Sequence, residues 1–166
     1  MIRRATMFDL NAIMDIVDRC KQQMKVQGNE QWNEAYPLHH HYEGDISSGT
    51  LFVSENSGYI TGVACISEKA HEDYDNIKWQ RNNVPYLCVK RLAVDPNYRS
   101  SGIGAAFYSF AEQLAHMKGI ELIRTDTYAK NKAALKLFQK AGYTYIDSLH
   151  LGDYESPFYY YEKILS

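Results

Sequence analysis

The sequence predicts one α/β domain over residues 1–166, and three observations point to it. A length of 166 residues is ordinary for a single domain. Apolar residues alternate along the chain between helical and strand spacing. From residue 86 onward the order is strand, helix, strand, helix, strand, and this order predicts a parallel strand pair joined by a right-handed crossover.

The first expected elements are a short strand at 2–5 and a helix at 7–26. Thr6 and Asp9 have the spacing of a capping box, which is typical of a helix start. Apolar residues then recur at helical spacing until Gly28, where we expect the helix to have ended.

The next region is irregular, with a short helix expected at about 38–48. Two runs rich in β-forming residues follow at 51–55 and 59–67, and the turn-forming sequence at 56–58 between them predicts a hairpin. Residues 68–85 are polar, and we expect them to form the one long, solvated connection of the fold.

Turn residues divide the rest of the chain at 95–97, Gly119 and Gly142. In order, the expected elements are a strand at 86–94, a helix at about 102–118, a strand at 121–128, a helix at 131–141, and strands near 143–149 and 157–164.

Composition excludes several classes of protein. Hydrophobic residues make up 45% of the chain and charged residues 23%, which indicates a folded globule. The net charge of −2 argues against a general nucleic-acid binder, which carries a basic excess. No apolar run approaches the roughly 20 residues of a membrane span, and the charged first ten residues are unlike a signal peptide. Cys20, Cys65 and Cys88 lack the spacing of a disulfide framework or zinc site, so we expect a cytoplasmic protein without a bound metal.

The segment 92–105 carries the chemistry, because a strand ends there and a helix opens on Arg99-x-x-Gly102-x-Gly104. The first amides of a helix lack intrahelical partners and lie at the positive end of its dipole, so they attract anions. Glycines let the backbone approach a ligand, Ser100 and Ser101 add hydroxyl donors, and arginine suits phosphate. The segment therefore predicts a pyrophosphate site.

Two common phosphate motifs do not fit this segment. A dinucleotide fingerprint needs a third glycine where Phe107 stands, and no Gly-Lys-Ser or Gly-Lys-Thr sequence occurs. The motif instead resembles the acetyl-CoA signature of the GNAT acetyltransferase superfamily, Arg/Gln-x-x-Gly-x-Gly/Ala after a strand. Residues 131–143 resemble the second cofactor segment of that family, with Asn131, Ala134 and the Gly142-Tyr143 pair in place. The segment from Gly28 to Pro37 also resembles small bacterial members of this family. The resemblance to the family covers essentially the whole chain.

The resemblance implies a central mixed, mostly antiparallel sheet with a splayed parallel strand pair ending near Val94 and Tyr128, flanked by about four helices. It also implies an enzyme that transfers acetyl from acetyl-CoA to a primary amine by direct attack in a ternary complex. The acceptor is a small molecule or a peptide, and a homodimer is plausible by family analogy. Acetylation of a protein N-terminus or a lysine stays open, as does a non-catalytic acyl-CoA-binding or sensing domain.

Residue roles follow from the same resemblance. Backbone groups of residues 92–94 would pair with the pantetheine arm, residues 99–105 would hold the pyrophosphate, and the second segment would contact the arm. The implied cofactor-binding residues are Leu92, Ala93, Val94, Arg99, Ser100, Ser101, Gly102, Ile103, Gly104, Ala105, Asn131 and Phe138.

Asp126 stands five residues before Asn131, where some family members carry the carboxylate that deprotonates the amine. Its short side chain favours a water relay. Phe138 replaces the tyrosine that protonates the departing thiolate in many members, so Tyr128, Tyr143 or solvent would have to do so. A purely structural role for Asp126, and helix capping by Asn131, are alternative interpretations.

Other residues that suggest a metal site or an acceptor pocket have simpler explanations. His39, His40 and His41 are consecutive, so they do not share one face of a helix or strand, and we expect a solvated stretch and no metal site. Trp32, Trp79 and Tyr36 are candidates for an acceptor pocket, and core packing or a dimer contact explains each of them at least as well.

Overall fold

The computed structural model describes all 166 residues, which form two compact units. Unit 1 comprises Met1–Ile66 and Arg91–Phe107, and unit 2 comprises Ser67–Lys90 and Tyr108–Ser166. Strand β4 (Leu87–Val94) and helix α3 (Ile103–Met117) each contribute residues to both units. Both units are thus built from segments that are far apart in the sequence.

Unit 1 contains the predicted N-terminal helices and hairpin. Its elements are β1 (Ile2–Arg4), the 3-10 turn η1 (Met7–Asp9), α1 (Leu10–Val26), α2 (His39–Ser47), β2 (Leu51–Asn56) and β3 (Tyr59–Ser67). Strand β2 pairs antiparallel with both β1 and β3. Helix α1 buries Ile13 and Val17 completely against strand residues such as Val53 and Val63, which explains its apolar spacing.

The start of the first helix uses the predicted Thr6 and Asp9 pair. The Asp9 carboxylate accepts a hydrogen bond from the Thr6 backbone N–H at 2.8 Å, and it is held from the other side by the Arg3 guanidinium at 2.9 Å. One carboxylate therefore joins the end of β1 to the first turn of the helix.

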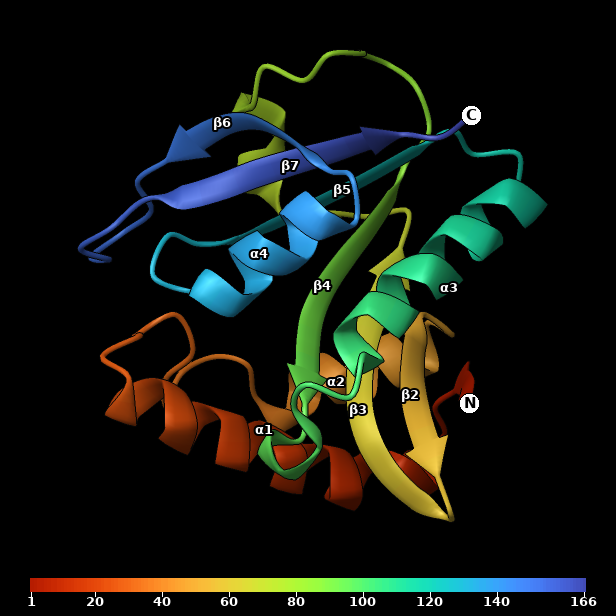
Figure 1. The fold of residues 1–166 in the computed structure, drawn as a ribbon, viewed down its shortest axis with the longest axis vertical. Coiled ribbons are helices and arrows are strands. Elements are labelled where there is room, and N and C mark those ends of the chain that lie inside the picture. Colours follow the sequence, from red (N-terminus) through yellow and green to blue (C-terminus); the bar gives the residue numbers. More distant parts are fainter. The chain divides into compact units, whose positions relative to one another are not determined.

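Unit 2 contains the 3-10 turn η2 (Glu72–Asn76), β5 (Leu122–Tyr128), α4 (Lys132–Lys140), β6 (Thr144–Leu149) and β7 (Phe158–Ile164). Strand β4 pairs parallel with β5, with Leu87 opposite Ile123 and Val89 opposite Thr125, which confirms the predicted parallel pair. Strand β7 pairs antiparallel with β5 and β6, and α4 lies in front of β5 and β7 in Figure 1. The mixed, mostly antiparallel strand pairing and the four helices agree with the predicted fold class. None of the helices is long and apolar enough to cross a membrane.

The connection at 68–85 is less solvated than its composition predicts. Tyr74 and Trp79 are only 2% and 8% exposed, and they pack with Cys88, Tyr128 and Tyr160 in the core of unit 2. The expectation of a solvated loop was wrong for these two residues, because their aromatic rings supply core volume that the polar neighbours hide in the sequence.

Arg124 anchors this connection to the sheet. Its guanidinium lies 4.3 Å from the Trp79 ring and 4.4 Å from the Tyr86 ring, and it donates to the carboxylate of the fully buried Glu162 at 2.7 Å. It also donates to the Arg81 carbonyl at 2.6 Å. The charge is therefore paired and hydrogen-bonded, as a buried charge must be.

A second buried ion pair fixes β4 in unit 1. Arg91 has a φ of +52°, a left-handed conformation that is rare for residues other than glycine. Its guanidinium donates to both oxygens of Asp45 on α2, at 2.7 and 2.5 Å, and to the Tyr36 hydroxyl at 3.1 Å. The Arg91 and Asp45 side chains are 8% and 11% exposed. This pair holds an unfavourable backbone conformation in place, next to the segment that the sequence singled out.

We predict that Asp45→Ala lowers the free energy of unfolding by about 3 kcal/mol, because it leaves the Arg91 guanidinium buried without a counter-ion. Urea unfolding at pH 7 measures the change. Glu155→Ala is the control, since it breaks an ion pair in which Glu155 is 78% exposed, and we expect a change of less than about 1 kcal/mol. Equal losses in both variants would contradict the prediction.

Candidate active site

The turn that opens α3 has the backbone shape of an anion cradle. After β4 the chain forms the 3-10 turn η3 (Pro96–Tyr98) and then passes through Ser100 and Gly102, both with left-handed φ values, +66° and +79°. Such residues bend successive N–H groups toward a common concavity. The amide of Ala106 donates to the Gly102 carbonyl at 3.0 Å, so the amides of residues 103–105 precede the first α-helical bond.

The charges around this turn favour an anion. Arg99 is exposed and forms no ion pair with any carboxylate. Its guanidinium is hydrogen-bonded to the Cys20 thiol, whose pKa is raised by burial, so its positive charge is not neutralised by this partner. The neighbouring Asp95 is buried, and its carboxylate is paired with Arg19 at 2.8 Å and accepts the Asn97 amide at 3.0 Å. The nearest acidic group is thus neutralised, and the turn keeps a positive potential.

Three predicted residues of the turn differ in their surroundings. An atom added at the Cβ position of Gly102 would meet nothing within 4 Å, so the turn is open at that point, as predicted. The Ser101 hydroxyl donates to the Tyr98 carbonyl and thus stabilises the turn itself. Ser100 is exposed.

Contacts within unit 1 hold the end of β4 that leads into the turn. Ala93 is buried, the Cys20 thiol donates to the Val94 carbonyl at 3.3 Å, and the Asp95 amide donates to the Thr61 carbonyl at 2.9 Å. Leu92 and Val94 are half-buried. The predicted residues 92–105 therefore form one continuous, anchored segment of unit 1.

Gly62 on β3 is a residue that the sequence analysis missed. A Cβ there would lie 3.0 Å from Ile103, 3.1 Å from Phe107 and 3.2 Å from the Ala93 carbonyl. A side chain here would force these neighbours to move by a few tenths of an ångström, so glycine suits the close packing of α3 and β4 on β3. A lone glycine inside a β-rich run was the available signal, because it marks a close approach of another segment.

Asp126 lies in unit 2, one residue beyond the last β5 residue that pairs with β4. Its side chain is half-buried, and Oδ1 accepts a hydrogen bond from the Tyr74 hydroxyl at 2.6 Å. Burial raises the pKa of the Asp126 carboxyl to about 7, with the Tyr74 hydrogen bond lowering it, nearby Asp73 raising it and Lys90 lowering it. A carboxyl that titrates near neutrality is suited to proton transfer.

Asn131 and Phe138 occupy structural positions in unit 2. The Asn131 side chain accepts the Ala134 amide at 3.2 Å, so it caps α4, as the alternative interpretation expected. Phe138 is 2% exposed and packs 5.0 Å from the Tyr161 ring and 5.5 Å from the Tyr108 ring. Contacts of either residue with a cofactor stay a prediction.

The two tyrosines considered as proton donors differ in their surroundings. The Tyr128 hydroxyl accepts the Ser156 amide at 2.9 Å. The Tyr143 hydroxyl is buried without a hydrogen-bond partner. Burial and the nearby Tyr108 and Glu112 raise the pKa of Tyr143 far above its usual value, which makes it a weaker acid than an ordinary tyrosine.

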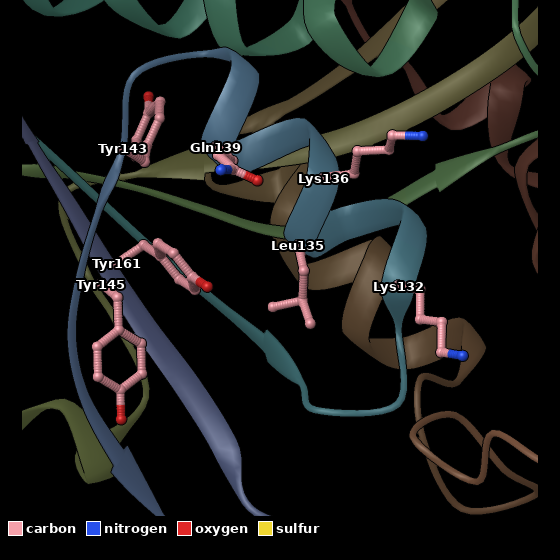
Figure 2. Close-up of a pocket in the computed structure, with 7 residues that line it drawn as sticks. All are labelled: Lys132, Leu135, Lys136, Gln139, Tyr143, Tyr145 and Tyr161. Atoms are coloured by element: carbon pink, nitrogen blue, oxygen red, sulfur yellow. The ribbon is translucent and has the colours of Figure 1, made fainter.

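Tyr143 also lines a groove of about 490 Å³ beside α4 (Figure 2). The lining residues are Lys132, Leu135, Lys136, Gln139, Tyr143, Tyr145 and Tyr161. In Figure 2 the ammonium groups of Lys132 and Lys136 point away from the three tyrosines. The polar groups do not converge, as they do in ligand sites, and Tyr143 is the one lining residue for which the sequence suggested a catalytic role.

The three consecutive histidines and the two tryptophans have structural roles. The three histidines begin α2, and the ring of His41 accepts the Leu38 amide at 2.8 Å at the start of that helix. No group of three or more His, Cys, Asp or Glu side chains is arranged to hold a metal ion. Trp32 and Trp79 are each 8% exposed and belong to the cores of unit 1 and unit 2.

Comparisons with known proteins give a consistent result. The chain matches the model of the acetyltransferase (GNAT) family over residues 10–143. A candidate acetyltransferase from Staphylococcus aureus Mu50 is 31% identical with a TM-score of 0.79, and the match covers 100% of this chain and 99% of that chain. A GNAT-family acetyltransferase from Streptococcus agalactiae 2603 is 26% identical with a TM-score of 0.87, covering 100% and 95%.

A candidate acetyltransferase from Salmonella typhimurium, solved with its cofactor acetyl-CoA, is 18% identical with a TM-score of 0.72, covering 100% of this chain and 94% of that chain. At that identity the likeness shows the fold alone. A search of curated proteins gave no match.

We predict that Gly62→Ala lowers the free energy of unfolding by about 2 kcal/mol, because the new methyl group lies closer than ordinary contact to atoms of β4 and α3 and pushes them apart. It should also speed hydrogen exchange at the amides of residues 103–107. Gly44→Ala in α2 is the matched control: nothing lies within 4 Å of its Cβ position, and alanine favours a helix, so we expect no loss of stability. Unchanged unfolding and exchange in the Gly62 variant would contradict the prediction.

Proposed function

Because the chain belongs to the GNAT acetyltransferase family, we propose that it transfers the acetyl group of acetyl-CoA to a primary amine, by direct attack with both substrates bound. Acetyl-CoA is the acetyl donor of this family. What we propose for this chain is the primary-amine acceptor, the order of the reaction steps and the residues that form the site. Residues 1–166 form the single acetyltransferase domain that does this.

The turn at 99–105 supports a binding site for the diphosphate of acetyl-CoA. Arg99 is exposed without an ion pair, Gly102 leaves the turn open, and three helix amides precede the first α-helical bond. A diphosphate accepts hydrogen bonds from amides and guanidinium at once. Residues 92–94 would pair with the pantetheine arm, and Asn131 and Phe138 would line it, as the family resemblance implies.

Asp126 carries the catalytic part of the proposal. An amine at pH 7 is mostly protonated, so it must lose a proton before its nitrogen can attack the thioester carbonyl. The half-buried Asp126 carboxylate, whose pKa is about 7, takes this proton directly or through water. The carbon–sulfur bond then breaks, and coenzyme A leaves as a thiolate.

Solvent or Tyr128 supplies the final proton to the thiolate. Phe138 has no proton to give, and Tyr143 is buried with a raised pKa, which makes donation unfavourable. A thiolate is a good leaving group and can depart before it is protonated, so a dedicated acid is not needed for turnover.

The rival functions differ in what they predict. A sensing domain would bind acetyl-CoA without amine-dependent release of free thiol, and acetylation of an N-terminus or a lysine would require a peptide acceptor. The Asp126 environment favours an enzyme over a sensor. We place the enzyme in the cytoplasm, because its three cysteines are buried and form no disulfide, and we propose a homodimer without a nucleic-acid partner.

The experiment that tests the proposal measures thiol release from acetyl-CoA with polyamines, aminoglycosides, amino acids and peptides as acceptors. We expect amine-dependent release, and Arg99→Ala should raise the KM for acetyl-CoA about tenfold with a small change in kcat. Arg81→Ala, which removes another exposed arginine, should leave KM unchanged. Tight acetyl-CoA binding without any amine-dependent release would favour the sensing domain.

The pH dependence follows from the role of Asp126. A base is active only when ionised, so kcat/KM should fall about tenfold per pH unit below a midpoint near pH 7, and level off above it. Asp126→Asn should lose most of the activity and this acidic limb, as measured from pH 5.5 to 9. Full activity of the Asn variant with the limb retained would show that another group is the base.

A further inference from the structure

We propose that Tyr74, in the connection between β3 and β4, is the positioning residue that holds Asp126 for proton transfer. This inference rests on the proposed role of Asp126 and adds the residue that controls it. Tyr74 would act through Asp126 and would not touch the substrate.

The hydrogen bonds around Tyr74 fix the direction in which its hydroxyl donates. The Cys88 thiol donates to the Tyr74 oxygen at 3.5 Å, and the Tyr74 hydroxyl donates to Oδ1 of Asp126 at 2.6 Å. Oδ1 accepts this hydrogen bond and Oδ2 accepts none from the protein, so Oδ2 is the oxygen better placed to take an incoming proton. The half-buried carboxylate therefore presents one oxygen for the reaction.

The ring of Tyr74 is itself fixed. Its backbone carbonyl accepts the Trp79 indole N–H at 2.9 Å, and its ring packs 5.4 Å from both Trp79 and Tyr160, edge-to-face on the latter. The residue is 2% exposed. A connection that only linked two strands would not have to bury and fix an aromatic ring. Here the packing holds a loop hydroxyl against a carboxylate 52 residues away in the sequence.

The same turn also carries a group with the opposite effect. Asp73 precedes Tyr74, and its carboxylate accepts the hydroxyl of Tyr160 on β7. Its negative charge raises the pKa of Asp126, whereas the Tyr74 hydrogen bond lowers that pKa by stabilising the ionised form. Two adjacent residues of η2 thus oppose each other at one carboxylate.

The remaining titratable groups that face Asp126 come from three other elements. They are Cys88 and Lys90 on β4, Tyr108 on α3 and Tyr160 on β7. Lys90 lowers the pKa of Asp126, and its ammonium donates to the Lys69 carbonyl at 3.0 Å. Burial raises the pKas of Tyr108 and Tyr160, so these two stay neutral in the working pH range.

Tyr74→Phe tests the inference, because it keeps the ring and removes the donor. The pKa of Asp126 should rise, so the acidic limb of kcat/KM should move up by about one pH unit. Activity at pH 7 should fall about fivefold and recover to near wild type at pH 9. A merely structural defect would lower the activity at every pH.

Asp73→Asn should move the limb the other way, to lower pH, because a negative charge near Asp126 is lost while the Tyr160 hydroxyl keeps an acceptor. Tyr159→Phe is the matched control, since that half-buried tyrosine lies on β7 and its hydroxyl makes no hydrogen bond with the protein; its profile should equal wild type. Opposite shifts from neighbouring residues cannot come from a general loosening of the loop.

The outcomes separate this inference from the proposed function. If Asp126→Asn is inactive while Tyr74→Phe, folded and with a wild-type melting temperature, keeps the wild-type limb, the positioning role of Tyr74 is overturned and the base remains. If Asp126→Asn keeps full activity and its limb, both proposals are overturned. If the Tyr74 variant fails to fold, Asp73→Asn becomes the test. An unshifted acidic limb of kcat/KM in that variant would also count against the inference.

Discussion

The buried pair of Arg91 and Asp45 is the constraint on which the candidate site depends. Arg91 adopts a left-handed backbone conformation in the middle of a strand, and only glycine does so without an energetic cost. The bidentate bond to Asp45 and the bond to Tyr36 hold it there. Because the backbone turns at Arg91, the next three residues are oriented by this pair, and they lead directly into the turn that opens α3. A helix of the N-terminal half thus fixes the path of the strand that the family resemblance assigns to the cofactor.

The anion cradle needs close packing as well as the right motif. Its amides are useful only if the first turn of α3 is held still, and Gly62 permits that by letting β3 touch Ile103 and Phe107. Asp95 contributes in a second way: paired with Arg19, it fixes the start of the turn without leaving a negative charge that would repel a diphosphate. In the proposed site the motif residues would bind the diphosphate, and residues outside the motif hold the turn rigid.

Most of the fold was predictable from the sequence because its signals are local. Helical spacing, the turn at 56–58 and the stop at Gly142 depend on neighbours within a few residues, and the helices and strands formed where they were expected. The turn at 99–105 was predictable for the same reason. Tyr74, Arg91 and Gly62 were not, because each acts on a partner far along the chain. The polar composition of 68–85 concealed two buried aromatic rings, since a loop can enter a core with two side chains and leave the rest in water.

The chemistry of Asp126 follows from a balance that neither burial nor hydrogen bonding achieves alone. Burial by itself would keep the carboxyl protonated, and such a group could not accept a proton at neutral pH. Several strong donors would lower its pKa so far that it would be a feeble base. Burial, with Asp73 beside it, raises the pKa, the Tyr74 hydrogen bond and Lys90 lower it, and the balance leaves the carboxyl near neutrality. An amine with a pKa well above 7 loses its proton more readily to such a group than to an ordinary aspartate. If Asp126 is the base, as we propose, the long connection between β3 and β4 tunes the proton transfer as well as filling the core.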